Sequence, residues 1–174
     1  GGGSMQITSA SKENKFSIYE GFMAAVSFKD MIISDIQKKD YKKITSPNPL
    51  QKKGALESVK MARLEARKIP ENIKEKIANG AMVIGIGGVH YNSVREQINN
   101  KTNEYTTGEL QKTLKNNARL SDAKIGGDYS ATQVSNLALV LGFMQELGIK
   151  KVTSAKINMA DGVLIAPELI KNKE

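Results

Sequence analysis

The sequence contains no cysteine, and its only histidine is His90. Disulfides, thiolate nucleophiles and metal sites built from cysteines or clustered histidines are therefore excluded within this chain, and we expect no metal ligands in it. No apolar run approaches the roughly 20 residues that span a bilayer. The longest, Leu137 to Met144, is interrupted by Gly142, and we find no secretory signal at the start. These absences predict a cytoplasmic protein that does not enter a membrane.

Acidic residues are too few to balance the basic ones. The chain has 26 lysines and arginines against 18 aspartates and glutamates, a net charge of +8. This excess favours a polyanionic partner such as nucleic acid, a phosphate polymer or an anionic membrane face. Only four of the basic residues are arginine, the better bidentate phosphate ligand, so a solvated lysine surface stays open as an alternative. The lack of clustered arginines with interleaved aromatics argues against sequence-specific nucleic-acid binding.

The first quarter of the chain reads as three strands followed by a helix. Residues 5–10 and 15–20 alternate as a hairpin would, and the apolar stretch 22–28 predicts a third strand. From Ser27, a plausible N-cap, the apolar period becomes helical. The pattern predicts a three-strand antiparallel meander.

Helices dominate the rest. Helical patterns cover 49–68, 70–77 and 131–147, and Thr106 with Glu109 forms a capping box that opens another helix. Residues 122–129 read as a loop, Gly148 as a helix stop and 151–155 as a short strand, and 163–169 closes the chain. With a length suited to one domain, this order predicts an α/β, ribonuclease-H-like fold: the meander extended by parallel strands, with helices on both faces.

The strongest candidate site is the glycine turn Gly85-Ile86-Gly87-Gly88. The apolar run 81–86 before it predicts a strand buried on both faces, and residues 89–99 after it predict a helix. Such a turn lets backbone N–H groups approach a phosphate beside a helix N-terminus. It lacks the Lys-Ser/Thr of a P-loop and the spacing of a dinucleotide fingerprint. Close strand–helix packing is the alternative explanation.

Polar residues follow this glycine turn. His90 could position a phosphate or a water, although a capping or packing role is the commoner one for such a histidine. Asn92 and Ser93 could line the same pocket. The loop carboxylates Asp122, Asp128 and Asp161 are not paired by their spacing, so they carry no acid/base assignment.

A second glycine turn, Gly1-Gly2-Gly3-Ser4, stands at the start of the sequence. Its amides and the Ser4 hydroxyl could cradle a phosphate, because glycine allows both positive φ and close approach. An expression linker ahead of Met5 is the alternative.

Taken in order, these segments resemble the second lobe of the exopolyphosphatase and guanosine pentaphosphate phosphohydrolase (Ppx/GppA) family. Gly1 to Ser4 with the hairpin and residues 21–26 resembles the family's Asp-x-Gly-Gly-Gly-Ser turn and the strands after it. Residues 83–88 resemble its second glycine turn, and residues 140–164, ending in Asp161-Gly162-Val163-Leu164, resemble its long helix, strand and final motif. The match covers nearly the whole chain.

The resemblance implies that residues 1–174 are one domain, the C-terminal lobe of a two-lobe phosphatase with an actin-like fold. Such enzymes hydrolyse the terminal phosphoanhydride of polyphosphate or guanosine pentaphosphate with Mg²⁺ and an attacking water. Gly1, Gly2, Gly3 and Ser4 would hold one phosphate group, and Gly87 and Gly88 another. The absent N-terminal lobe would carry the first phosphate loop, the glutamate base and most of the Mg²⁺ ligands. No catalytic residue is then expected in this chain, which alone would be inactive, and a homodimer is open.

The sequence also departs from the family. Val89, His90 and Tyr91 follow the second turn where the family usually has Thr and small residues, and Ala160-Asp161 stands in place of Arg-Glu. Two other functions stay open: a non-enzymatic polyanion-binding module, and a lobe of another actin-like ATPase or a sugar kinase.

Overall fold

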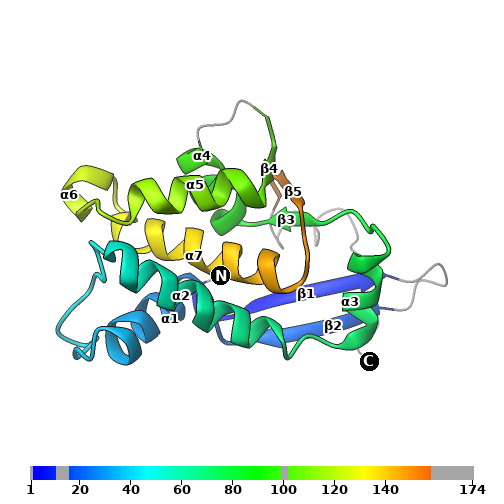
Figure 1. The fold of residues 1–174 in the computed structure, drawn as a ribbon, viewed down its shortest axis with the longest axis horizontal. Helices are drawn as coiled ribbons and strands as arrows, with labels where there is room; N and C mark the ends of the chain where they lie inside the picture. Colours follow the sequence, from blue (N-terminus) through cyan, green and yellow to red (C-terminus); the bar gives the residue numbers. More distant parts are fainter. Residues whose placement is uncertain (1, 11–15, 99–101, 158–174) are drawn as a thin grey trace, which may run out of the picture.

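The fold is described here from a computed structural model, over residues 2–10, 16–98 and 102–157. Two small sheets flank a group of helices centred on α7 (Ser130–Glu146). Figure 1 shows α7 lying between α2 (Gln51–Ala66) on one side and α5 (Thr107–Asn117) on the other. Every residue of α7 from Val134 to Met144 is buried, so the predicted apolar helix forms the centre of the core.

The α2–α7 contact is made by small residues. A Cβ on Gly142 would lie 2.5 Å from the Cβ of Ala62 and 2.7 Å from the carbonyl oxygen of Val59. The two helices approach this closely only because residue 142 has no side chain. On the exposed rim of this contact, the Glu146 carboxylate pairs with Arg63 at 2.9 Å and with Arg67 at 2.8 Å.

The N-terminal strands form a hairpin, as predicted. β1 (Met5–Ala10) pairs antiparallel with β2 (Phe16–Gly21), with Met5 opposite Gly21 and Ala10 opposite Phe16. The Tyr19 hydroxyl donates to Glu65 on α2 at 2.8 Å and thereby ties the hairpin to the helices. α3 (Glu71–Ala78), also predicted, packs against β1.

The predicted third strand over 22–28 is wrong, because most of it is the helix α1 (Ala25–Met31). The carbonyl oxygen of Gly2 accepts from the first-turn amides of Val26 and Ser27 at 2.8 and 3.1 Å, which fixes the helix start. Ser27 is not the N-cap: that position is Ala24, and the Ser27 hydroxyl instead accepts from the Ala24 amide at 2.9 Å. No three-strand meander exists among the described residues.

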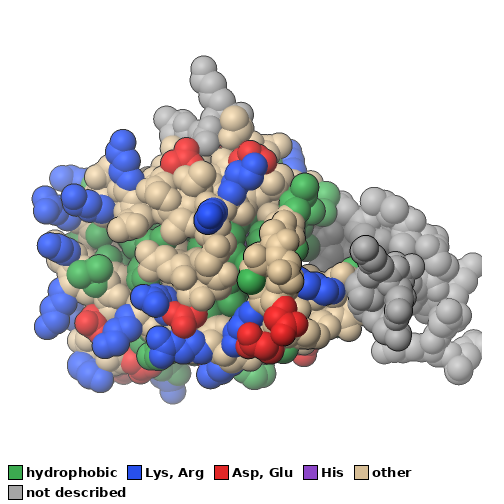
Figure 2. All heavy atoms as spheres, turned by 45° about the vertical axis from the view of Figure 1, so that its right-hand side comes forward, with side chains coloured by type: hydrophobic (Ala, Val, Ile, Leu, Met, Phe, Trp, Pro, Cys, Tyr) green, Lys and Arg blue, Asp and Glu red, His purple; other side chains and the backbone are tan. Residues whose placement is uncertain are grey.

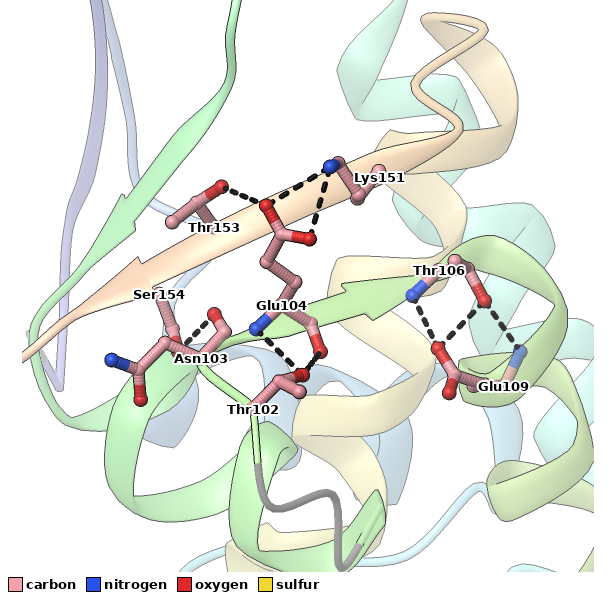
Figure 3. Close-up of polar contacts among 8 residues, drawn as sticks. All are labelled: Thr102, Asn103, Glu104, Thr106, Glu109, Lys151, Thr153 and Ser154. Atoms are coloured by element: carbon pink, nitrogen blue, oxygen red, sulfur yellow. Dashed lines mark hydrogen bonds and ion pairs between the residues drawn. The ribbon is translucent and has the colours of Figure 1, made fainter.

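The second sheet has the order β3-β5-β4. β5 (Lys151–Ala155) is central, parallel to β3 (Ile84–Ile86) and antiparallel to β4 (Glu104–Thr106), a strand that the sequence did not reveal. Figure 3 shows the β4–β5 contacts: Glu104 accepts from Lys151 at 2.9 Å and from Thr153 at 3.3 Å. β3 is an edge strand with Ile84 and Ile86 about half exposed, so its predicted burial on both faces is wrong.

Short helical segments complete the described chain. η1 (Ile32–Ile36) and η2 (Val89–Val94) have π geometry, and α4 (Arg95–Ile98) continues η2. The predicted loop 122–129 begins with a single-turn helix, α6 (Asp122–Ile125), and Gly148 has the positive φ of +67° expected of a helix stop. The described part of the chain includes no helix long and apolar enough to cross a membrane. The α/β class is confirmed, whereas Asp161, Gly162 and residues 163–169 lie outside the described residues.

Candidate phosphate-binding turns

In the first glycine turn, Gly2 has a structural role, because its backbone contacts the start of α1. Its carbonyl oxygen accepts from the Val26 and Ser27 amides, so these two amides at the N-terminus of α1 are not available to an anion. A Cβ on Gly2 would lie 3.3 Å from Val26 Cγ2, a tight contact. Gly1 lies outside the described residues. The donors that this turn can offer a ligand are therefore the amides of Gly3 and Ser4.

Gly3 and Ser4 leave room for a ligand. A Cβ on Gly3 would meet no atom within 4 Å. Within the described part of the chain, neither the Gly3 nor the Ser4 amide donates a hydrogen bond. A shallow hollow of about 130 Å³ adjoins Ser4 and is lined by Met5, Gln6, Glu20, Gly21 and Phe22 as well. The Glu20 carboxylate, which accepts from Gln6 at 2.8 Å, disfavours an anion deep in this hollow.

The second glycine turn has the geometry of an anion-binding turn. Gly87 has φ +83°, which L side chains rarely adopt, and its amide donates to the carbonyl oxygen of Ile157 at 3.2 Å. Gly88 is exposed, and a Cβ there would come no closer than 3.8 Å to another residue, at Asn92 Nδ2. The helical segment 89–98 follows at once. The exposed backbone at Gly88 thus faces open space at the start of a helix.

His90 turns away from that space and packs inside. Its Nδ1 lies 2.6 Å from the Tyr105 hydroxyl, and its ring stacks on the Tyr105 ring at 6.4 Å. A Cβ on Gly85 would lie 2.5 Å from the imidazole Cγ and Nδ1, so glycine at 85 makes space for this ring. Burial lowers the pKa of His90 to about 4 and raises that of Tyr105. Both side chains are therefore neutral near pH 7, and the packing role that the sequence left open for His90 has direct support.

Asn92 and Ser93 point to different places. Asn92 is exposed beside Gly88 and can reach a ligand held at the turn. Ser93 is 4% exposed, and its hydroxyl donates to Gln133 on α7 at 2.7 Å. Ser93 thus contributes to packing between η2 and α7, and we do not include it among the ligand contacts. Its partners Gln133 and Asn136, and Tyr105 beside His90, had no sequence signal because they are distant in the chain.

The carboxylates do not assemble a metal site. No group of three His, Cys, Asp or Glu side chains that could hold a metal ion occurs in the described ranges. Asp122 accepts from Ser46 and from Asn48, both at 2.9 Å, and so fixes a loop. The described residues do not fit a Mg²⁺ site made by this chain alone.

Solved structures of Ppx/GppA proteins have the same fold. The Aquifex aeolicus family member matches all of this chain with a TM-score of 0.71 at 12% identity. The type II variant of the Aquifex aeolicus Ppx/GppA phosphatase matches 95% of it with a TM-score of 0.70 at 12% identity. An exopolyphosphatase-like protein matches 98% with a TM-score of 0.68 at 9% identity. The resemblance drawn from the motifs is thus confirmed at the level of the fold.

This chain spans a little more than half the length of those proteins, namely 56%, 54% and 58% of them in the same order. No protein-family model matches the sequence, and no curated protein matches it. The likeness therefore concerns the fold, and function has to be argued from the turns.

Proposed function

We propose that this chain is the C-terminal, phosphate-binding lobe of a two-lobe phosphoanhydride hydrolase acting on inorganic polyphosphate or guanosine pentaphosphate. The observation that carries the proposal is the Gly87-Gly88 turn, with its positive φ and its exposed backbone ahead of a helical segment. The Ppx/GppA fold supports the phosphate class of the ligand.

The role of the lobe is to hold phosphate oxygens. The backbone amides of Gly88, Gly3 and Ser4 would stabilise negative charge on the transferring phosphoryl group without a proton transfer of their own. The Gly87 amide donates to Ile157, so Gly87 would contribute by shaping the turn through its positive φ. The base would come from the other lobe. As the resemblance to the family implies, the metal would be held mainly by residues outside this chain. The 174-residue chain should then release no phosphate from polyphosphate, and measurable release would contradict the proposal.

The binding role can be tested with sodium tripolyphosphate by isothermal titration calorimetry. Gly88 has helical φ and open space, so Gly88→Val adds bulk at the turn without backbone strain. We expect a loss of affinity of roughly tenfold or more, the effect of one charged hydrogen bond. Gly108→Val is the matched control, because Gly108 is also exposed and helical, and a Cβ there would meet no atom within 4 Å, but it lies on α5. No binding by the wild type, or equal losses in both variants, would refute the phosphate turn.

A polyanion-binding surface is the second candidate, and one observation favours it. Lys38, Lys39, Lys42 and Lys43 are all exposed on one loop between η1 and α2. Figure 2 shows lysine and arginine side chains gathered along the left edge of the molecule. Binding to this surface would fall steeply with salt and would not change in Gly88→Val. The same titration, repeated at several salt concentrations, separates the two candidates.

The cytoplasmic location and the homodimer stay predictions. A lobe of another actin-like ATPase or of a sugar kinase stays an open alternative. ATP binding by the wild type in place of tripolyphosphate binding would favour that alternative.

A further inference from the structure

A buried polar network joins the helical segment after the second glycine turn to the central helix. Ser93 of η2 donates to Gln133 Oε1 at 2.7 Å and accepts from Asn136 Nδ2 at 3.1 Å. Gln97 of α4 donates to the carbonyl oxygen of Gln133 at 2.8 Å and to its Oε1 at 3.0 Å. Asn117 of α5 donates to Gln97 Oε1 at 3.1 Å. Four helical elements, η2, α4, α5 and α7, therefore meet through amides and one hydroxyl.

The hydrogens in this network fix its direction. Ser93 has one hydroxyl hydrogen, which goes to Gln133, so the serine oxygen can only accept from Asn136. Reversing the Asn136 amide would set two acceptors against each other. The arrangement leaves Asn136 Oδ1 buried and without a hydrogen-bond donor among the described residues. Asn136 is 3% exposed.

An orphaned acceptor in the core is unfavourable for stability, and an apolar side chain of similar volume would avoid it. What Asn136 does provide is a directional contact across two elements, which an apolar side chain cannot supply. The contact reaches Ser93, close in the chain to Gly88. On another side of the same π segment, His90 is fixed by Tyr105. η2 is thus clamped by polar contacts with α7 and with β4.

We propose that Ser93, Gln133 and Asn136 are positioning residues that fix the Gly87-Gly88 turn relative to α7, although none of them touches phosphate. The inference deepens the proposed function and rests on it for the ligand. The structural part of the inference is that the network keeps the backbone of the turn in one conformation, and this can be measured without any ligand.

The experiment compares two buried serines in the 174-residue chain. Ser93→Ala removes the hydroxyl of the network. Ser135→Ala is the matched control, because the Ser135 hydroxyl is equally buried but donates only to Thr132 of its own helix, at 3.0 Å. Asn136→Leu is the second variant, since it removes both the network contact and the orphaned acceptor at similar volume. Amide hydrogen exchange is followed at two amides. The Gly87 amide donates to the carbonyl oxygen of Ile157, and the Tyr91 amide donates to the carbonyl oxygen of Gly87.

We expect exchange at these two amides to accelerate about tenfold or more in Ser93→Ala and Asn136→Leu and less than about twofold in Ser135→Ala. Asn136→Leu should melt at or above the wild-type temperature, which separates positioning from mere stability. Tripolyphosphate affinity should fall together with the loss of protection. Unchanged exchange in both network variants, or equal acceleration in Ser135→Ala, overturns the inference. If the wild type binds no tripolyphosphate, the proposed function fails, and the exchange rates still decide whether the network holds the turn.

Discussion

Gly142→Ala should destabilise the protein, although it places a better helix former in the middle of a helix. The added Cβ would lie 2.5 Å from the Ala62 Cβ, 2.7 Å from the Val59 carbonyl oxygen and 3.1 Å from the Arg63 amide nitrogen. Two of these three atoms belong to the backbone of α2 and cannot move as the end of a side chain can. Relief therefore requires α2 and α7 to separate along their whole contact.

The magnitude follows from two opposing effects. Overpacking of a well-packed core costs about 1–3 kcal/mol, and replacing glycine by alanine inside a helix returns about 1 kcal/mol. The clash with two backbone atoms places the overpacking near the top of its range. We expect a net loss of about 1–2 kcal/mol, or roughly 2–8 °C in melting temperature for a chain of this size.

Urea unfolding measures the change, and Gly54→Ala supplies the control. Gly54 is inside α2, but a Cβ there would come no closer than 3.8 Å, to Leu50 Cβ. That variant should gain about 0.5–1 kcal/mol from helix propensity alone. Adding Ala62→Gly to Gly142→Ala should recover part of the loss, because it removes one of the two partners in the 2.5 Å contact. If Gly142→Ala is as stable as Gly54→Ala, the close packing of α2 and α7 is refuted.

Two further predictions concern the cap of α5 and the buried histidine. Thr106→Ala should lower the free energy of unfolding by about 1 kcal/mol in urea melts, because Glu109 N donates to Thr106 Oγ1 at 3.2 Å, and Thr106→Ser should keep most of it. His90, whose pKa falls to about 4 on folding, resists protonation in the folded state. Stability should therefore be full above about pH 6.5 and fall as the pH drops toward 4, by up to about 3 kcal/mol. His90→Gln should flatten this decline between pH 6.5 and 4.5, and an unaltered decline would contradict the burial of the imidazole.

The predictions that succeeded depend on neighbours in the sequence. The capping box of Thr106 and Glu109 is confirmed, with the Thr106 amide donating to Glu109 at 2.8 Å, because both partners lie within one helical turn. The α7 helix and its stop at Gly148 were readable for the same reason. In these segments local propensity and burial favour the same structure.

The predictions that failed depend on residues far along the chain. Residues 22–28 are apolar enough for a strand. They form a helix instead because the Gly2 carbonyl oxygen accepts from the Val26 and Ser27 amides and so fixes the start of α1. β4 has only three residues and exists through its pairing with β5. The apolar run before Gly87 suggested burial, but β3 lies at the edge of its sheet.

In the candidate site too, features set by neighbouring residues could be predicted from the sequence, and features set by distant residues could not. The Gly87-Gly88 turn was found from a local pattern, and Gly87 does have a positive φ. The sequence offered Ser93 as a residue that could line the pocket. Its packing contact could not be predicted, because its hydroxyl partner Gln133 is 40 residues away on α7. Phosphate binding at Gly2, Gly3, Ser4, Gly87 and Gly88 stays a prediction for the titration to decide, and Gly1 lies outside the described residues.

The place of β5 between β3 and β4 has a consequence for the folding of the protein during its synthesis on the ribosome. Glu104 and Thr153, opposite each other in the sheet, are 49 residues apart, and β5 is the last of the described strands to be synthesised. While the ribosome is still extending the chain, β3 and β4 have no strand to pair with, and Ile84 and Ile86 lie on an open edge. Such an edge is a template for association with another nascent chain. A nonsense mutation before Lys151 would therefore yield an aggregating product in addition to losing function.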